Sequence, residues 1–341
     1  MNESEFGTPP SKLQVGVVGA GVVATEAHIP ILSSRDDVEI KYIADVDDEQ
    51  TKSLARANGT DPHIIDDPST VPDCDIALLA TPVGARKEYM KVFGGRGTPV
   101  FAEKPFAISC SQHMRFLDLV DTPFCNYMRT KFGAMDQLQT LVTTELFGSV
   151  HSVSVTESYP GKSGGSRTYM TDSELSGGGI LMDHGVHIMS QLFHIFPNAT
   201  PTVDDVSVVA VDGLDVDVKS KLSFESDTRT VMVDLHLSTV DPTENRILIE
   251  FDHGVASLRH ADPGANVKIH TSTSVTDRLE LSQNETGAYS WKQAIYLMWD
   301  EFIQALKAGT DYDANSHTGF AITELVEEMY DNAEIVENLN P

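Results

Sequence analysis

Positively charged residues are scarce in this sequence relative to negatively charged ones. It carries 24 Lys and Arg residues against 51 Asp and Glu, which gives a formal net charge of −27 at pH 7, and the acidic residues are spread along the chain. A field of this sign repels nucleic acid and anionic membrane surfaces, so neither is an expected partner. It also destabilises the compact state through self-repulsion unless salt screens the charges.

We therefore predict a protein adapted to high salt. At about 1 M salt the Debye length falls to about 3 Å, and repulsion between surface carboxylates is largely screened. We expect the free energy of unfolding to rise between low and molar KCl, measured by urea denaturation across a KCl series. Equal stability at both ends of the series would instead fit an acidic protein from an ordinary cell.

Cysteines and long apolar runs are also scarce. Cys74, Cys110 and Cys125 are odd in number and lack metal-ligand spacing, which is typical of reduced thiols in the cytosol. The sequence has no uncharged apolar run of about 18 residues, the length that a transmembrane helix needs. Residues 1–11 are polar and lack the regions of a signal peptide, so we expect a flexible leader. These absences predict a cytoplasmic protein without a membrane span.

The first part of the chain alternates strand-like and helix-like segments. A length of 341 residues is sufficient for two domains. The βαβ rhythm predicts an α/β fold, a doubly wound parallel sheet of the Rossmann type over residues 12–125. The predicted strands and helices are residues 13–19, 22–32, 38–44, 47–57, 75–80 and 99–102.

From about residue 126 the pattern changes to strands that alternate apolar and polar residues, as in a sheet with one face in water. We predict an α+β domain over residues 126–341 with an open-faced, largely antiparallel sheet, and a last helix that packs back on the Rossmann domain. The strands are expected at residues 150–155, 206–211, 216–224, 230–237, 246–251 and 255–258, and the helices at 135–147, from 183 to about 197, 290–307 and 318–337.

A glycine-rich loop follows the first predicted strand and opens a helix. Gly19 permits the tight turn, Gly21 lets the backbone approach a pyrophosphate, and a small residue at position 24 lets helix and strand pack closely. Backbone N–H groups at the helix start, around Val22 and Val23, suit phosphate oxygens. The loop predicts a dinucleotide-binding site.

Asp45 ends the second predicted strand, where a carboxylate can accept hydrogen bonds from the adenosine ribose. A carboxylate there repels a 2′-phosphate and favours NAD, with NADP as the alternative. Asp45 could also be a helix-capping or solvated acid, like its neighbours Asp47 and Asp48.

Glu103-Lys104-Pro105 comes directly after a predicted strand, at the carboxyl end where open α/β sheets bind ligands. A lysine at this edge can hold a substrate hydroxyl and stabilise the alkoxide as hydride leaves the carbon. A surface lysine is the simpler alternative, but the preceding strand and following proline fix its position. The sequence Ala80-Thr81-Pro82 ends another predicted strand in the same way.

The segment 177–187 places a triple glycine directly before a helix-like stretch that contains Asp183 and His187. On an α-helix, residues four apart share one face. A carboxylate beside an imidazole can orient the ring and raise its protonated fraction near neutral pH, which suits proton transfer. An isolated pair of this kind is more often an ordinary surface or core feature, and the other motifs favour the catalytic interpretation.

These motifs, in this order and at these separations, resemble the Gfo/Idh/MocA family of NAD(P)-dependent oxidoreductases. The resemblance implies a Rossmann domain followed by an open-faced sheet domain that pairs subunits into homodimers or homotetramers. It also implies a catalytic group at the positions of Lys104, Asp183 and His187. Two positions depart from the family pattern: Arg86 stands where a histidine is common, and Ser190 where an acid is common.

Arg86 could add positive charge near the cofactor, or it could be a solvated residue in the first turn of a helix. The cofactor contacts that we expect are Gly19, Gly21, Val22, Val23, Asp45, Thr81, Pro82, Arg86, Glu103 and Lys104. Weaker candidates for a polyol pocket, each of which could be ordinary loop or surface, are Tyr127, Arg129, Tyr159, Arg167 and Tyr169. His184 and His187 lack a clear third ligand, so no metal is expected.

The sequence thus predicts an NAD(P)-dependent dehydrogenase acting on a secondary alcohol of a sugar, polyol or sugar derivative. In this prediction His187 exchanges the hydroxyl proton, Asp183 orients it, and Lys104 stabilises the oxyanion. Two alternatives stay open: a non-catalytic NAD(P)-binding sensor, and a glycosidase that oxidises its substrate transiently with a tightly bound NAD. Fold-level analogy alone does not choose among them.

Overall fold

The computed structural model describes residues 12–160, 168–227, 229–271, 278–282, 287–310 and 313–337. The predicted leader, residues 1–11, lies outside this range. The chain forms two compact units: one comprises Met1–Thr81, Arg86–Ala102 and Leu119–Pro123, and the other Pro82–Ala85, Glu103–Asp118 and Phe124–Pro341. The segment that begins with the Glu-Lys-Pro motif therefore groups with the second unit, while the domain boundary near residue 125 stays a prediction.

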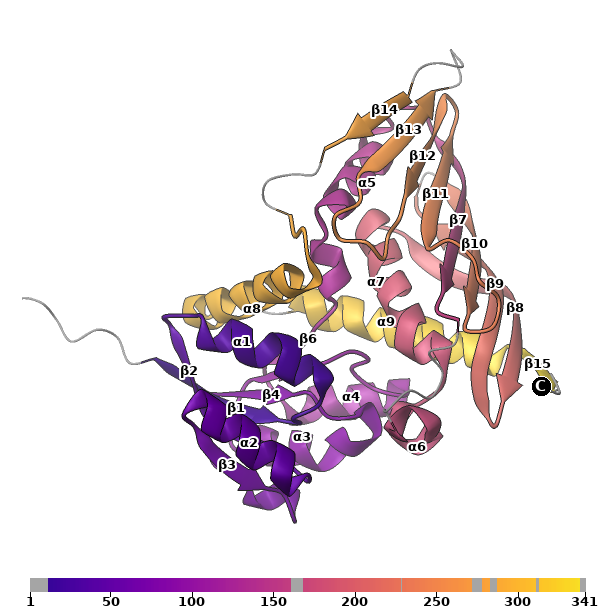
Figure 1. Cartoon of the computed structure of the whole chain (residues 1–341). Helices are drawn as coiled ribbons and strands as arrows, with labels where there is room; N and C mark the ends of the chain where they lie inside the picture. The colour runs from indigo at the N-terminus through magenta and orange to yellow at the C-terminus, as the bar shows by residue number, and fades with distance from the viewer. Residues whose placement is uncertain are drawn as a thin grey trace, which may run out of the picture. The chain divides into compact units, whose positions relative to one another are not determined.

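The Rossmann sheet is parallel in all its described pairings, with the strand order β3-β2-β1-β4-β5-β6 (Figure 1). Val15, Val17 and Val18 of β1 are fully buried, as expected for a strand covered on both faces. This confirms the predicted doubly wound α/β fold. The elements are β1 Leu13–Val18, a π-helical turn at Ala24–His28, α1 Ile29–Ser33, β2 Val38–Asp45, α2 Asp48–Asn58, β3 Asp61–Ile64, a short turn at Pro68–Thr70, β4 Ile76–Leu79, α3 Arg86–Gly95, β5 Val100–Ala102 and β6 Pro123–Cys125.

Helix α2 shows how local sequence sets an element. The Asp47 carboxylate caps its start by accepting from the Gln50 backbone N–H at 3.0 Å, a bond that satisfies one free donor of the first turn. Gly59 ends the helix with a φ of 66°, the left-handed conformation that favours glycine at this position. The edge strand β3 was not predicted, because its sequence Asp-Pro-His-Ile contains a proline, and prolines are confined to edges and strand starts.

The second unit is built on a nine-stranded mixed sheet with the order β14-β13-β12-β11-β7-β10-β9-β8-β15. The β7–β10 and β8–β15 pairs are parallel and the others antiparallel, which confirms the largely antiparallel sheet. Its strands are β7 Val150–Ser158, β8 Thr200–Val211, β9 Leu214–Glu225, β10 Thr230–Ser238, β11 Arg246–Phe251, β12 Gly254–Leu258, β13 Val267–Thr271, β14 Arg278–Leu281 and β15 Glu334–Glu337.

Helices α5, α7 and α9 lie on one side of this sheet (Figure 1). Strand β10 alternates exposed and buried residues, with Val233 and Leu235 buried, and each fully buried aliphatic side chain contributes about 1.5–3 kcal/mol. The helical elements are Val83–Ala85, α4 Cys110–Leu119, Met128–Lys131, α5 Gly133–Thr144, Thr168–Thr171, α6 Ser173–Ser176, the π-helical turn Leu181–Gly185, α7 Val186–Ile195, α8 Trp291–Ala308 and α9 Asp313–Asp331. No helix in the described ranges combines the length and apolar character needed to cross a bilayer.

Two predicted helix ends were wrong. The helix expected to run to residue 147 ends at Thr144, where Glu145 turns to a φ of 52°. The last helix was expected to run to residue 337 but ends at Asp331, and Glu334–Glu337 forms β15, which pairs with β8. A four-residue segment of this kind gains its strand hydrogen bonds only from a distant partner, so local pattern does not identify it.

His113 links α4 to α9 inside the second unit and gives a testable acid sensitivity. Its Nδ1 lies 2.8 Å from the Thr323 hydroxyl, and its ring contacts Phe106 and Phe320. Burial lowers the pKa of His113 from 6.5 to about 4. The unfolded chain therefore binds the proton first as pH falls, and the stability present above pH 6.5 is lost towards pH 4.

For His113→Leu we expect the loss of stability between pH 7 and pH 4.5 to shrink by about 2 kcal/mol relative to the unsubstituted protein. Urea unfolding at both pH values measures this difference. The control is His253→Leu, because His253 is exposed and its loss should leave the pH dependence unchanged. An identical acid loss in His113→Leu and in the unsubstituted protein would contradict the assignment.

Candidate active site

The glycine-rich loop has the geometry of a dinucleotide cradle. Gly19 has a φ of +100°, and a Cβ there would lie 2.7 Å from the Ala80 backbone, so only glycine fits. Its N–H donates to the Ala44 carbonyl at 2.8 Å. A Cβ at Gly21 would meet nothing within 4 Å. The loop is therefore packed against its own sheet at Gly19 and has room at Gly21 for a group that approaches the backbone.

Asp45 is tied to this loop. Its two carboxylate oxygens accept the Ala20 N–H at 2.6 Å and the Asp47 N–H at 3.0 Å. The cap of α2 is Asp47, so the helix-capping alternative for Asp45 was wrong. The Asp45 carboxylate is thereby held against the glycine-rich loop.

Arg86, at the start of α3, is buried rather than solvated. Its side chain donates from Nε and Nη2 to the Thr81 carbonyl at 3.3 and 3.0 Å, and only 1% of the residue is exposed. The first-turn surface interpretation was therefore wrong. Arg86 thus ties Thr81, two residues after the end of β4, to the start of α3.

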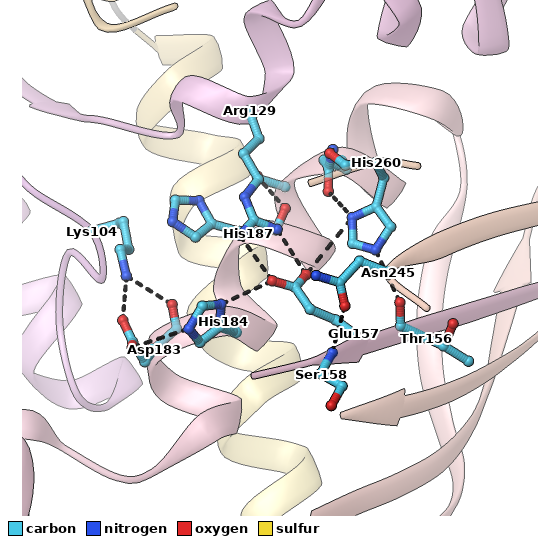
Figure 2. Close-up of polar contacts among 12 residues, drawn as sticks. Lys104, Arg129, Thr156, Glu157, Ser158, Asp183, His184, His187, Asn245 and His260 are labelled. Carbon is cyan, nitrogen blue, oxygen red and sulfur yellow. Dashed lines mark hydrogen bonds and ion pairs between the residues drawn. The ribbon is translucent and has the colours of Figure 1, made fainter. Parts of the chain in front are cut away.

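Lys104 and Asp183 form the centre of the site in the second unit. The Lys104 Nζ lies 2.6 Å from Asp183 Oδ1 and 2.8 Å from the Asp183 carbonyl oxygen (Figure 2). The two side chains are 17% and 26% exposed, so a ligand can reach this ion pair. Beside it, Glu103 accepts from the Asn126 amide at 2.6 Å, and the Lys104-Pro105 peptide bond is cis.

His187 lies near this pair but does not bind Asp183. It is 6% exposed, and its Nδ1 is a buried atom without a hydrogen-bond partner. Burial, followed by the charges of Arg129, Lys104 and His184, lowers the pKa of His187 well below 6.5. The expectation that Asp183 orients His187 and promotes its protonation was therefore wrong: Asp183 holds Lys104, and His187 is neutral.

A buried ion-pair cluster adjoins the site. Glu157 on β7 is fully buried and receives two hydrogen bonds from Arg129, at 2.7 and 2.9 Å, and one contact from His184 Nδ1 at 2.9 Å (Figure 2). His260 Nδ1 lies 3.7 Å from the same carboxylate. Burial favours the protonated acid, but Arg129, His184 and His260 outweigh it and hold the pKa of Glu157 well below its usual range.

Sequence reasoning missed Glu157 and His260, yet one signal pointed to Glu157. The strand alternates, and Val153, Val155 and Glu157 share the buried face. A carboxylate at a buried position of an apolar face needs a charged partner. That partner, Arg129, was predicted only as a possible pocket residue. No local signal identified His260, whose contacts come from Gln191 on α7 and from Thr156 and Glu157 on β7.

The triple glycine serves packing within the second unit. A Cβ at Gly177 would lie 2.4 Å from the Ile108 side chain, and one at Gly179 would lie 2.0 Å from the Asp215 carbonyl oxygen. The Asp215 carboxylate accepts the N–H groups of Gly179 and Leu181 at 2.5 and 2.7 Å. These contacts fix the start of the turn that carries Asp183.

Only some of the weaker candidates for a polyol pocket lie beside Lys104 and Asp183. Tyr159 stacks on His184, with ring centroids 4.1 Å apart, and Arg129 binds Glu157, so both adjoin Lys104 and Asp183. Tyr127 is buried, at 4% exposure, and Tyr169 is 36% exposed. Arg167 lies outside the described residues. Among the described side chains, no group of three or more His, Cys, Asp or Glu residues is placed to hold a metal ion.

Family models cover both parts of the chain. Residues 13–128 match the oxidoreductase family with an NAD-binding Rossmann fold, and residues 135–257 match the Gfo/Idh/MocA C-terminal domain. The chain therefore belongs to the Gfo/Idh/MocA oxidoreductase family, and its first part is the NAD(P)-binding domain of that family. This confirms the predicted resemblance.

Curated relatives match only part of the chain. D-glucoside 3-dehydrogenase of Escherichia coli is 27% identical over 197 residues, which cover 54% of this chain and 54% of the relative. Inositol 2-dehydrogenase of Burkholderia vietnamiensis is 28% identical over 109 residues, covering 31% and 32%. The matched region thus spans about half the length of the first relative and less of the second.

Solved structures share the fold over nearly the whole chain. The 3-ketoreductase KijD10 from Actinomadura kijaniata, solved with NADP and TDP-benzene, superposes with a TM-score of 0.82 at 18% identity, covering 96% of this chain and 100% of that one. An aldose-aldose oxidoreductase from Caulobacter crescentus, solved with glycerol, gives a TM-score of 0.80 at 15% identity, covering 94% and 97%. At these identities the likeness establishes the fold.

Proposed function

We propose that this chain is an NAD-dependent oxidoreductase that transfers hydride between nicotinamide and a secondary alcohol carbon of a sugar, polyol or sugar derivative. The observation that carries the proposal is the reachable Lys104–Asp183 pair beside the buried, neutral His187. The names of the relatives, a glucoside dehydrogenase and an inositol dehydrogenase, support the substrate class.

The residues of the first unit fit the cofactor. Gly19 and Gly21 would receive the pyrophosphate against the loop backbone, with Val22 and Val23 at the helix start, because a Cβ at Gly21 meets no neighbouring atom. Asp45 would accept from the ribose and favour NAD over NADP. The remaining proposed contacts are Thr81, Pro82, Arg86, Glu103 and Lys104. When bound, the nicotinamide supplies hydride chemistry.

In alcohol oxidation, the neutral imidazole of His187 would accept the proton of the substrate hydroxyl. The Lys104 ammonium would donate a hydrogen bond to the same oxygen as it becomes an alkoxide, and so stabilise the developing negative charge. Asp183 holds this ammonium through its carboxylate and its carbonyl oxygen. A buried polar atom without a protein partner, as at His187 Nδ1, is typical of a functional site.

The lowered pKa of His187 predicts the pH profile. Because the imidazole stays neutral as pH falls through 6.5, we expect the acid limb of kcat/KM for oxidation to lie below that value. The measurement is kcat/KM from pH 5 to pH 9 in molar KCl, with circular dichroism at each pH as the control for folding. An acid limb centred at 6.5 or higher in folded protein would contradict this assignment.

The test of the proposed function is a screen of sugars and polyols with NAD in molar KCl, followed by absorbance of NADH and by product analysis. Net NADH formation with a ketose or keto-sugar product supports the dehydrogenase. Release of a sugar from a glycoside without net NADH would overturn it in favour of a transient oxidation. Tight NAD binding with no product from any substrate would favour a sensor. We expect no requirement for a metal and a homodimer or homotetramer formed through the open sheet.

A further inference from the structure

His184 stands between the Lys104–Asp183 pair and the buried cluster. Its Nδ1 lies 2.9 Å from Glu157 Oε1, and its Nε2 lies 3.3 Å from Asp183 Oδ2 (Figure 2). The ring of Tyr159 stacks on its face at 4.1 Å and 28°. The imidazole is therefore fixed on three sides, and each of its nitrogens faces a carboxylate.

The two carboxylates around His184 can both receive a hydrogen bond from its ring only if both ring nitrogens are protonated. A carboxylate only accepts hydrogen bonds, and a neutral imidazole has a single N–H to donate. The neutral ring can serve Glu157 or Asp183, and it then turns a lone pair towards the other oxygen. Only the imidazolium serves both, and a stacked aromatic face further favours a cation.

The other charges around His184 come from several elements. Arg129 and Lys104 are cations that oppose an additional positive charge, and each already pairs with one of the two carboxylates. Burial lowers the pKa values of His187 and His260, and burial with the Glu157 charge raises the pKa of Tyr159. These three groups are therefore neutral. The charged groups around His184 are therefore two carboxylates, Glu157 and Asp183, and two cations, Arg129 and Lys104.

We propose that His184 is a positioning residue that works as an imidazolium and ties Asp183 to Glu157. This proposal rests on the proposed function. One Asp183 oxygen binds Lys104 and the other faces His184, so the carboxylate has a fixed orientation. Lys104 Nζ is thereby held at the place where it meets the substrate oxygen. The fully buried Glu157–Arg129 pair anchors the whole chain of contacts to β7.

The activity test is His184→Gln, which removes the charge and leaves an amide that can donate to only one carboxylate at a time. Displacement of a catalytic group by about 1 Å costs about 10²-fold in rate. We expect kcat to fall by about that factor while KM changes by only about twofold. The matched control is His194→Gln, because His194 on α7 also pairs with a carboxylate, Asp136 at 2.9 Å. This change at a partly exposed residue outside the site should leave kcat within about twofold.

A second measurement does not depend on activity. In protein with ¹⁵N-labelled histidine, the ring signals missing from His184→Gln identify His184. We expect both ring nitrogens of His184 to carry a proton in the folded protein. A single protonated ring nitrogen at pH 7 would overturn the proposal. If His184→Gln fails to fold, substitutions of the other histidines assign their signals, and the remaining signals in the unsubstituted protein are those of His184.

The two measurements separate the possible failures. An imidazolium signal in a protein that oxidises no sugar would count against the proposed function and leave the charge of His184 supported. Normal kcat in folded His184→Gln, with sugar oxidation intact, would overturn the positioning role alone. A loss of kcat together with a doubly protonated ring supports both.

Discussion

Replacing Lys104 with methionine is expected to lower kcat for sugar or polyol oxidation by about 10³-fold, the upper range for loss of one donor to a developing oxyanion. Methionine keeps the length and apolar stem of lysine but removes the ammonium. The Lys104 Nζ is the group that Asp183 holds at 2.6 Å, so its loss removes the proposed stabilisation of the alkoxide. NAD binding should be largely intact, because the loop at Gly19 and Gly21 is unchanged.

The measurement compares kcat, KM and the dissociation constant for NAD in Lys104→Met and the unsubstituted protein. The matched control is Lys91→Met, because Lys91 is an exposed lysine on α3 that pairs with Glu88 at 2.7 Å. Its loss should change kcat by no more than about twofold. A fully active Lys104→Met variant that still binds NAD would remove Lys104 from the mechanism. Loss of NAD binding would show that Lys104 acts mainly as one of the proposed cofactor contacts.

The candidate site was predictable where a motif carries its own geometry. Gly19 lies against Ala80 as the loop pattern requires, and Lys104 follows β5 at the end of the strand. The partner of Asp183 was not predictable in the same way. The four-residue spacing to His187 assumes an α-helix, but Leu181–Gly185 forms a π-helical turn. Spacing within one segment also does not reveal that Lys104, 79 residues earlier in the chain, binds the Asp183 carboxylate.

Two of the strands that the sequence did not predict depend on hydrogen bonds to a partner strand elsewhere in the chain. Strand β11, Arg246–Phe251, was predicted with its bounds, whereas the strand expected at 206–211 begins at Thr200 and the one expected at 150–155 ends at Ser158. The short strands Asp61–Ile64 and Glu334–Glu337 were not predicted, because each is defined by hydrogen bonds to a partner strand, β2 and β8 respectively. For four residues, such pairing outweighs local propensity.

Glu157→Gln is expected to lower the free energy of unfolding by about 3–5 kcal/mol, because it leaves the Arg129 cation buried without its counter-charge. Both side chains are buried, at 0% and 6% exposure, so water does not replace the lost carboxylate. The pKa of Glu157, held well below its usual range, means that this stability is present above pH 4.5 and is lost as pH falls. Urea unfolding at pH 7 in molar KCl measures the change.

The control is Glu225→Gln at the exposed end of β9, which should change the unfolding free energy by no more than about 0.5 kcal/mol. A similar small effect at Glu157 would show that the Arg129 pair is not buried in solution.

The double variant Arg129→Met, Glu157→Met separates stability from catalysis at this cluster. A buried ion pair is often replaced by apolar residues without loss of stability, because both desolvation costs disappear together. We therefore expect the double variant to recover most of the stability that Glu157→Gln loses. In the double variant, however, the Glu157 carboxylate that faces His184 Nδ1 is absent, so His184 is no longer held in place. We therefore expect kcat to be about 10²-fold below that of the unsubstituted protein. Recovery of both stability and kcat would show that the buried pair serves the fold alone.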